Sequence, residues 1–165
     1  MKVNISDILK KEGASLNIEF NEKMEELNSI DPGTVFGEPV VFKGNLVNIG
    51  GVLKLRGRLY TRYTAKCYRC LKDVTCSVDV DVTEDYISAE KNQDADAYTY
   101  EGSYIVIDKA FIDNIILNLP MKKVCSESCK GLCPMCGTDL NVSECGCKDN
   151  PMNLQMEILK NLLNN

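Results

Sequence analysis

The stretch that decides the architecture of this chain is CSESCKGLCPMCGTDLNVSECGC, residues 125–147, which contains six cysteines. Two of them, Cys133 and Cys136, are separated by two residues and followed by Gly137. This spacing lets backbone N–H groups point at the two sulfurs while the chain turns sharply, as in the knuckle of a tetrahedral zinc site. The stretch therefore predicts a metal-binding segment in the C-terminal part of the chain.

A disulfide framework is the alternative use of so many cysteines. The first residues contain no apolar run of signal-peptide length, and no stretch approaches the length of a transmembrane helix, so we expect a cytoplasmic protein. Reduced thiols favour metal binding, and the nine cysteines of the chain cannot all pair with one another. Zinc is preferred over disulfides, and also over an iron–sulfur cluster because no spacing here matches the ferredoxin patterns.

A second close pair, Cys67 and Cys70, lies where we expect the tip of a β-hairpin. A thioredoxin-like redox pair needs a helix N-terminus in a βαβ unit, so metal binding is the better interpretation. With Cys76 set aside as a small core residue, the remaining eight cysteines form two four-cysteine zinc sites. We predict one site from Cys67, Cys70, Cys125 and Cys129, and the other from Cys133, Cys136, Cys145 and Cys147.

Two other partitions of the cysteines remain open. One zinc ion bound by the last six cysteines would leave two thiols spare. Alternatively, two zinc ions would share six thiolates through bridging sulfurs.

The composition limits both fold and chemistry. A chain of 165 residues with 44% hydrophobic content can bury one core, so we expect a core domain over residues 1–120 and a cysteine-rich segment with a terminal helix over residues 121–165. The absence of histidine removes the commonest general base and the Ser-His and Cys-His nucleophile pairs, which argues against hydrolytic catalysis. We expect neither an enzyme nor a small-molecule substrate.

The central part of the chain has the two-residue period of β-strands. Residues 35–83 alternate apolar and polar positions with interruptions at Gly50–Gly51 and at residues 67–73, which predicts a three-stranded antiparallel meander. The expected core faces are Leu53, Leu55, Leu59, Thr61 and Tyr63 on the middle strand, and Val74, Cys76, Val78, Val80 and Val82 on the third.

Helical patterns flank these strands. Residues 21–28 predict a short helix, residues 88–102 an acidic loop, and residues 104–107 a strand. Asp108 is the expected N-cap of a helix that covers the sheet and ends at Pro120. Its apolar positions are Phe111, Ile112, Ile115, Ile116 and Leu119, and a terminal helix is expected to carry Leu154, Ile158 and Leu162. The fold class predicted is therefore α+β.

Basic residues line the outward face of the expected middle strand, although the chain has a net charge of −5. Lys54, Arg56, Arg58 and Arg62, which we call the basic stripe, could follow a phosphate backbone, with Tyr60 or Tyr68 stacking on an unpaired base. The row continues through Lys66, Arg69 and Lys72. The stripe is equally well explained as a solvated face, because the expected hairpin places Asp79 and Asp81 opposite Tyr60 and Arg58.

Three motifs together resemble the YceD family: CxRCL at residues 67–71, IxLxLP at residues 115–120, and Cx3CKGLCx2CGxDLN at residues 125–141. That family is associated with accumulation of large-subunit ribosomal RNA in bacteria and its maturation in chloroplasts. The resemblance implies a noncatalytic role in biogenesis of the large ribosomal subunit, through ribosomal RNA, a ribosomal protein or a precursor particle. The alternative is a redox-regulated zinc thiol protein with chaperone-like activity, which would release metal on oxidation.

Overall fold

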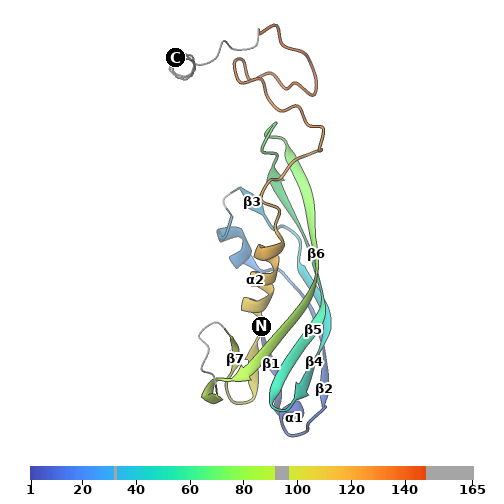
Figure 1. Cartoon of the computed structure of the whole chain (residues 1–165), viewed down its shortest axis with the longest axis vertical. Helices are drawn as coiled ribbons and strands as arrows, with labels where there is room; N and C mark the ends of the chain where they lie inside the picture. The colour runs from blue at the N-terminus through green and yellow to red at the C-terminus, as the bar shows by residue number, and fades with distance from the viewer. Residues whose placement is uncertain (32, 92–96, 148–165) are drawn as a thin grey trace, which may run out of the picture. The chain divides into compact units, whose positions relative to one another are not determined.

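The computed structural model describes residues 1–31, 33–91 and 97–147. Along the chain the elements are β1 (Lys2–Asn4), α1 (Ser6–Leu9), β2 (Ser15–Glu22), the 3-10 helix η1 (Glu25–Ser29), β3 (Thr34–Val35), β4 (Val40–Ile49), β5 (Val52–Lys66), β6 (Asp73–Ser88), the 3-10 helix η2 (Ala89–Lys91), β7 (Tyr98–Tyr100), β8 (Tyr104–Val106) and α2 (Asp108–Asn118) (Figure 1). The protein is thus mostly β-sheet with few helices, as expected for an α+β chain.

The chain divides into two compact units. The sheet unit comprises Met1–Ala65 and Val74–Met121, and the cysteine unit comprises Lys66–Asp73 together with the chain from Lys122 onward. The connection between β5 and β6 thus belongs with the cysteine-rich segment that follows α2. The predicted division into domains at residue 120 stays a prediction.

The sheet unit is built on a six-stranded sheet with the order β2-β4-β5-β6-β7, and β3 pairs with β5. Strand β4 pairs antiparallel with both β2 and β5, whereas β7 runs parallel to β6. Ile49 pairs with Val52, so Gly50 and Gly51 form a two-residue turn with φ angles of 61° and 86°. Positive φ at both positions is what a tight hairpin turn requires, and glycine adopts it without steric cost.

The alternation of apolar residues in β5 and β6 correctly identifies most of the core, whereas Val74, also expected on the core face, is half-buried and outside it. Leu53, Leu55, Leu59 and Tyr63 of β5 are buried. In β6, Val78 and Val82 are buried, while Cys76 and Val80 pack partly buried against the same core. Cys76 therefore behaves as the small core residue that the sequence predicts.

Helix α2 lies against the sheet through Phe111. The Phe111 ring centroid is 4.6 Å from that of Phe42 in β4 and 5.5 Å from that of Phe20 in β2. The predicted cap was wrong: Ile107 is the N-cap, and Asp108 lies in the first turn, where its carboxylate pairs with the amino group of Met1. Ile116 was expected on the buried face but is exposed.

Two further expectations from the sequence were wrong. Asn21 and Glu22 do not begin a helix but end β2, because their pairing with β4 outweighs local helix propensity, and only the 3-10 helix η1 follows. The stretch expected to be a loop contains β7, in which Tyr98 pairs with Tyr86 of β6. The predicted terminal helix lies outside the described residues.

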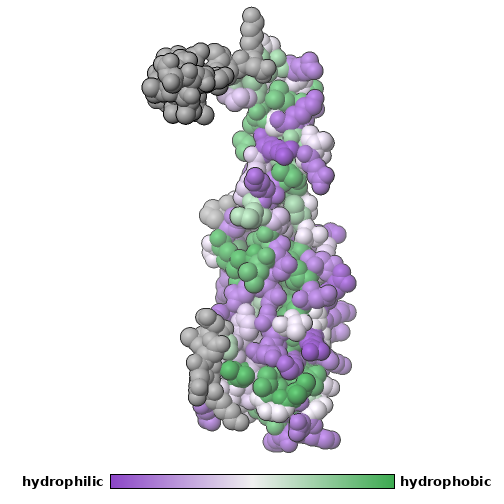
Figure 2. Space-filling model, viewed as in Figure 1, coloured by the Kyte–Doolittle hydropathy of each residue, from purple (hydrophilic) through white to green (hydrophobic). Residues whose placement is uncertain are grey.

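The exposed surface mixes hydrophobic and hydrophilic side chains. Figure 2 shows hydrophobic side chains in several separate groups on one face, with hydrophilic side chains between them. Within the described residues, no helix combines the length and apolar character needed to cross a membrane.

The pairing of β4 with β5 depends on two facing glycines. Gly44 lies opposite Gly57, and the tip of the Phe42 ring fills the space beside them. A Cβ atom built on Gly57 would lie 2.5 Å from the carbonyl oxygen of Lys43 and 2.6 Å from the Phe42 ring. Neither distance is tolerated by a packed core, so the sheet must open locally to admit a methyl group.

We predict that Gly57→Ala lowers the free energy of unfolding by about 1–3 kcal/mol, because the added methyl overpacks the strand pair. Gly37→Ala is the matched control, since a Cβ there meets nothing within 4 Å. The control should change stability by less than about 0.5 kcal/mol. Urea unfolding curves of the two variants measure the difference, and equal midpoints would contradict the steric argument.

Candidate metal centre

The first cysteine pair lies in the tight turn between β5 and β6. The backbone N–H of Cys67 donates to the carbonyl of Lys72 at 2.8 Å, and that of Leu71 donates to the carbonyl of Cys67 at 2.9 Å. Leu71 has a φ of 61°, and no other described residue except glycine has a positive φ. The closed turn brings the N–H of Arg69 to 3.4 Å from the Cys67 sulfur, which is the knuckle that the CxxC spacing predicts.

Backbone hydrogen bonds bring the chain after Lys122 to this knuckle. The N–H of Tyr68 donates to the carbonyl of Lys123, and the N–H of Cys125 lies 3.4 Å from the Cys67 sulfur. The Arg69 guanidinium donates to the carbonyls of Glu127 and Cys129, both at 2.9 Å. Arg69 thus holds the loop that carries Cys129.

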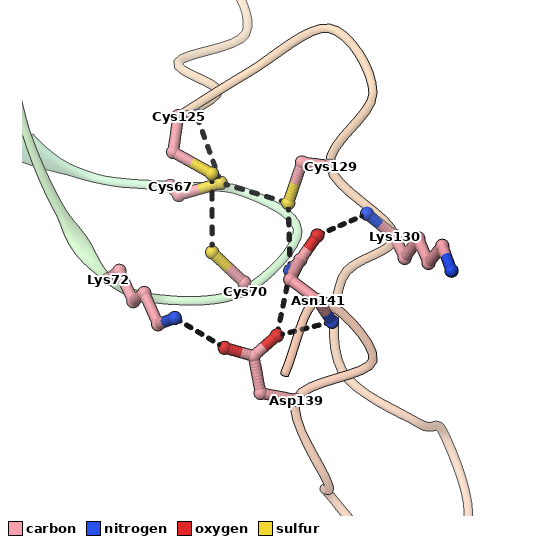
Figure 3. A network of polar contacts seen from close by, with 8 residues as sticks. All are labelled: Cys67, Cys70, Lys72, Cys125, Cys129, Lys130, Asp139 and Asn141. Atoms are coloured by element: carbon pink, nitrogen blue, oxygen red, sulfur yellow. Dashed lines mark hydrogen bonds and ion pairs between the residues drawn. The ribbon is translucent and has the colours of Figure 1, made fainter. Parts of the chain in front are cut away.

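Four sulfurs converge at the first cluster, which we define as Cys67, Cys70, Cys125 and Cys129 (Figure 3). The Cys67 and Cys129 sulfurs are 4.0 Å apart, the Cys70 and Cys125 sulfurs are 3.6 Å apart, and all four lie within 4.8 Å of one another. A tetrahedral zinc ion with bonds of about 2.3 Å requires sulfurs about 3.8 Å apart. The cluster therefore fits such an ion with little adjustment.

The second cluster consists of Cys133, Cys136, Cys145 and Cys147, whose sulfurs also lie within 4.8 Å of one another. Its knuckle is closed by the N–H of Gly137 donating to the carbonyl of Cys133 at 2.9 Å, with Gly137 at a φ of 73°. Cys133 is buried, but Cys136 and Cys147 are exposed. This second cluster is the more accessible of the two.

The two groups of four are the same sets that the sequence predicts, and none of the nine cysteines is in a disulfide. The geometry favours two separate groups of four cysteines over a single site drawn from the last six cysteines and over bridged thiolates. That the clusters hold zinc stays a prediction.

Hydrogen bonds lower the pKa of Cys67 and Cys129 in the first cluster and of Cys136 in the second. The N–H groups of Cys70, Arg69 and Cys125 lower the pKa of Cys67 to about 6, and the hydroxyl and N–H of Thr138 lower the pKa of Cys136 to about 6. Hydrogen bonding to neighbouring thiols raises the pKa of Cys125 to about 12, chiefly through Cys129. A bound metal ion takes up thiolates, so its binding would release the protons of the thiols that still carry them.

A polar network that the sequence analysis missed supports the first cluster (Figure 3). The Asn141 amide donates to the Cys129 sulfur at 3.4 Å and to the Asp139 carboxylate at 2.7 Å, and its oxygen accepts from the N–H of Lys130 at 2.8 Å. Asp139 also pairs with Lys72 at 2.7 Å, and these contacts lower the pKa of Asp139 to about 2. The GxDLN motif at residues 137–141 contains both Asp139 and Asn141, so the residues of the network are visible in the sequence. Their contact with Lys72 is set only by the fold.

The basic stripe is largely balanced by carboxylates. Lys54 pairs with Asp85 at 2.6 Å, Arg58 binds both oxygens of Asp79 at 2.6 and 2.8 Å, and Arg62 lies 3.8 Å from Glu38. Asp79 is one of the two carboxylates that the sequence analysis places on the facing strand. Within the described part of the chain, Arg56 is the member of the stripe without an ion pair. Nucleic-acid binding by these residues stays a prediction.

Comparison with known proteins places the chain in a family. It is 33% identical over 95 residues to an uncharacterized protein of Mycobacterium tuberculosis, covering 54% of this chain and 45% of that protein. It is 28% identical over 150 residues to the large ribosomal RNA subunit accumulation protein YCED homolog 1, chloroplastic, of Zea mays, covering 71% of this chain and 50% of that protein.

The chain therefore spans about half the length of these relatives. No solved structure matches it. A family model described as large ribosomal RNA subunit accumulation protein YceD matches residues 55–163, which include both cysteine clusters. Because that match covers most of the sequence, the chain belongs to the YceD family.

Proposed function

We propose that this protein is a noncatalytic zinc-binding factor in biogenesis of the large ribosomal subunit. It acts in the cytoplasm on large-subunit ribosomal RNA or on a precursor particle, directly or through a ribosomal protein. The observation that carries the proposal is the YceD match over residues 55–163. The description of that family names large ribosomal RNA subunit accumulation, and the maize relative bears the same name.

The packing of the cysteine unit supports a structural role for zinc. In its described part, the buried side chains are those of Cys67, Cys70, Cys129, Cys133 and Lys123. Large apolar residues such as Tyr68, Leu71 and Met135 are instead exposed. Since the described part of this unit buries no cluster of large apolar side chains, metal ligation supplies the free energy that orders it.

A second candidate function is favoured by the open second cluster. The exposed thiols of Cys136 and Cys147 suit a redox-regulated zinc protein that releases metal on oxidation and acts as a chaperone. The two functions differ in one measurement. An assembly factor retains its zinc and co-sediments with large-subunit precursors, whereas the redox protein gains activity only after an oxidant has removed zinc.

We predict about two zinc ions per chain in protein purified without added metal, as eight thiolates in tetrahedral sites require. Cys70→Ser and Cys136→Ser should each lower the content to about one, because each removes a ligand from a different cluster. Cys76→Ala, outside both clusters, should leave it unchanged. Elemental analysis measures the content, and a folded, metal-free wild-type protein would refute the assignment.

Asn141→Ala should weaken zinc binding at the first cluster by about 10- to 100-fold, because it removes the amide that binds a ligand sulfur and Asp139. Competition with a chromophoric chelator measures this affinity. Ser143→Ala, two residues along the same exposed loop, is the matched control and should have no effect. Equal affinities for the two variants would show that the network does not support the metal.

The basic stripe is tested with one variant that reverses a positive charge and one that neutralises a negative charge beside it. Co-sedimentation with large-subunit precursors is the measurement. If the stripe follows a phosphate backbone, Arg56→Glu weakens association, while Asp79→Asn strengthens it because it releases Arg58. Each gained or lost contact should change the log–log salt slope by roughly 0.7 to 0.9. Unchanged association of both variants would exclude the stripe, and failure of the wild-type protein to co-sediment would reject the proposed function itself.

A further inference from the structure

The sheet unit contains a cavity of about 670 Å³ that neither the metal centre nor the basic stripe explains. Its volume lies in the range of sites that hold small ligands or single nucleotides. Its lining includes Lys2, Tyr86, Tyr98, Glu101, Tyr104 and Lys109.

One wall is the two-stranded sheet of β1 and β8. In this sheet Lys2 pairs with Val106, and Asn4 pairs with Tyr104. Alternate residues of a strand share a face, so Lys2 and Tyr104 lie on the same side of the sheet. Tyr104 is 52% exposed and Val106 is 48% exposed, so both side chains present apolar surface to the cavity. This wall offers an aromatic platform beside a cation.

Lys109, in the first turn of α2, supplies a second cation to the lining. The Lys109 ammonium lies 5.7 Å from the centroid of the Tyr98 ring, and the Tyr98 hydroxyl donates to Asp113 at 2.8 Å. Neither Lys2 nor Lys109 forms an ion pair with any residue that the structure describes. In contrast to the stripe, both positive charges here are free to bind an anion.

The cavity also includes a buried hydroxyl that lacks a hydrogen-bond partner. The Tyr86 side chain is 1% exposed, and its hydroxyl has no partner among the described residues. Burial raises the pKa of Tyr86, so the group remains a neutral donor. A buried polar group in this state calls for a ligand or an ordered water.

We propose that this cavity binds one unpaired nucleotide of RNA, with its base stacked on Tyr104, its phosphate held by Lys2 and Lys109, and the Tyr86 hydroxyl as a hydrogen-bond donor. An exposed aromatic ring and two cations in one lining suit a nucleotide better than an acidic peptide, which would use the lysines but not the ring. Glu101, the carboxylate in the lining, disfavours a second phosphate and can accept from a base amino group. This inference rests on the proposed function, since RNA is the expected partner.

The test measures binding of a fluorescein-labelled oligo(A) RNA to the full chain by anisotropy at low salt. Tyr104→Ala should weaken binding by roughly 5- to 150-fold, the range found when a stacking ring is removed, and Tyr104→Phe should retain it. Lys109→Gln and Lys2→Gln should each lower the salt slope by about 0.7. Tyr86→Phe should weaken binding several-fold without lowering the melting temperature, because the hydroxyl it removes has no partner in the protein.

Tyr68→Ala provides the matched comparison, since Tyr68 is a 58% exposed tyrosine in the cysteine unit. Loss of binding with Tyr68→Ala but not with Tyr104→Ala would overturn the inference, as would a wild-type protein that does not bind the RNA. If wild-type protein co-sediments with precursors but Tyr104→Ala binds RNA normally, the proposed function stands and the nucleotide site is wrong. If the wild-type protein does not bind the RNA but Tyr104→Ala abolishes co-sedimentation with precursors, the cavity binds a protein partner instead.

Discussion

The convergence of four sulfurs on one point, twice in the cysteine unit, is the constraint on which that unit depends. Thiolates held within 4.8 Å of one another repel, and protonated thiols at these distances gain little. A divalent cation removes the repulsion and binds all four ligands at once. The surrounding backbone agrees with that role, because N–H groups point at the Cys67 sulfur from both Arg69 and Cys125.

The sheet unit is stabilised in a different way. Its long strands bury an alternating apolar face, and Phe111 of α2 packs against Phe20 and Phe42. The paired glycines Gly44 and Gly57 leave room for the Phe42 ring between the strands. Since β5 and β6 lead directly into the turn that carries Cys67 and Cys70, ordering of these two strands also brings the first cysteine pair together. Convergence of the first cluster then needs only Cys125 and Cys129, which the chain supplies after α2.

The parts of the structure that the sequence predicts are those set by local spacing. Ligand spacing within CxxC pairs and the two-residue period of β5 and β6 depend on nearby residues, so both were read correctly. The strand β7 was missed because it has only three residues, too few to show a two-residue period. It is a strand because it pairs with Tyr86 and its neighbours in β6, and that pairing leaves no pattern in the local sequence. The Asp108 cap failed because Ile107 takes that position when β8 leads straight into α2. The contact of Asn141 with Cys129 depends on the folded loop, which no spacing rule describes.

The charge distribution limits how an acidic protein of this kind can contact RNA. With a net charge of −5, the overall field repels phosphate, and three of the four stripe residues are neutralised by Asp85, Asp79 and Glu38. A ladder of phosphate contacts is then weaker than the row of basic residues suggests. Stacking of a base on an aromatic ring is much less sensitive to net charge, because its energy comes from dispersion and desolvation. For the proposed binding of RNA, a few free cations and an exposed ring, as at Lys2, Lys109 and Tyr104, therefore suit this chain better than a long but paired basic face.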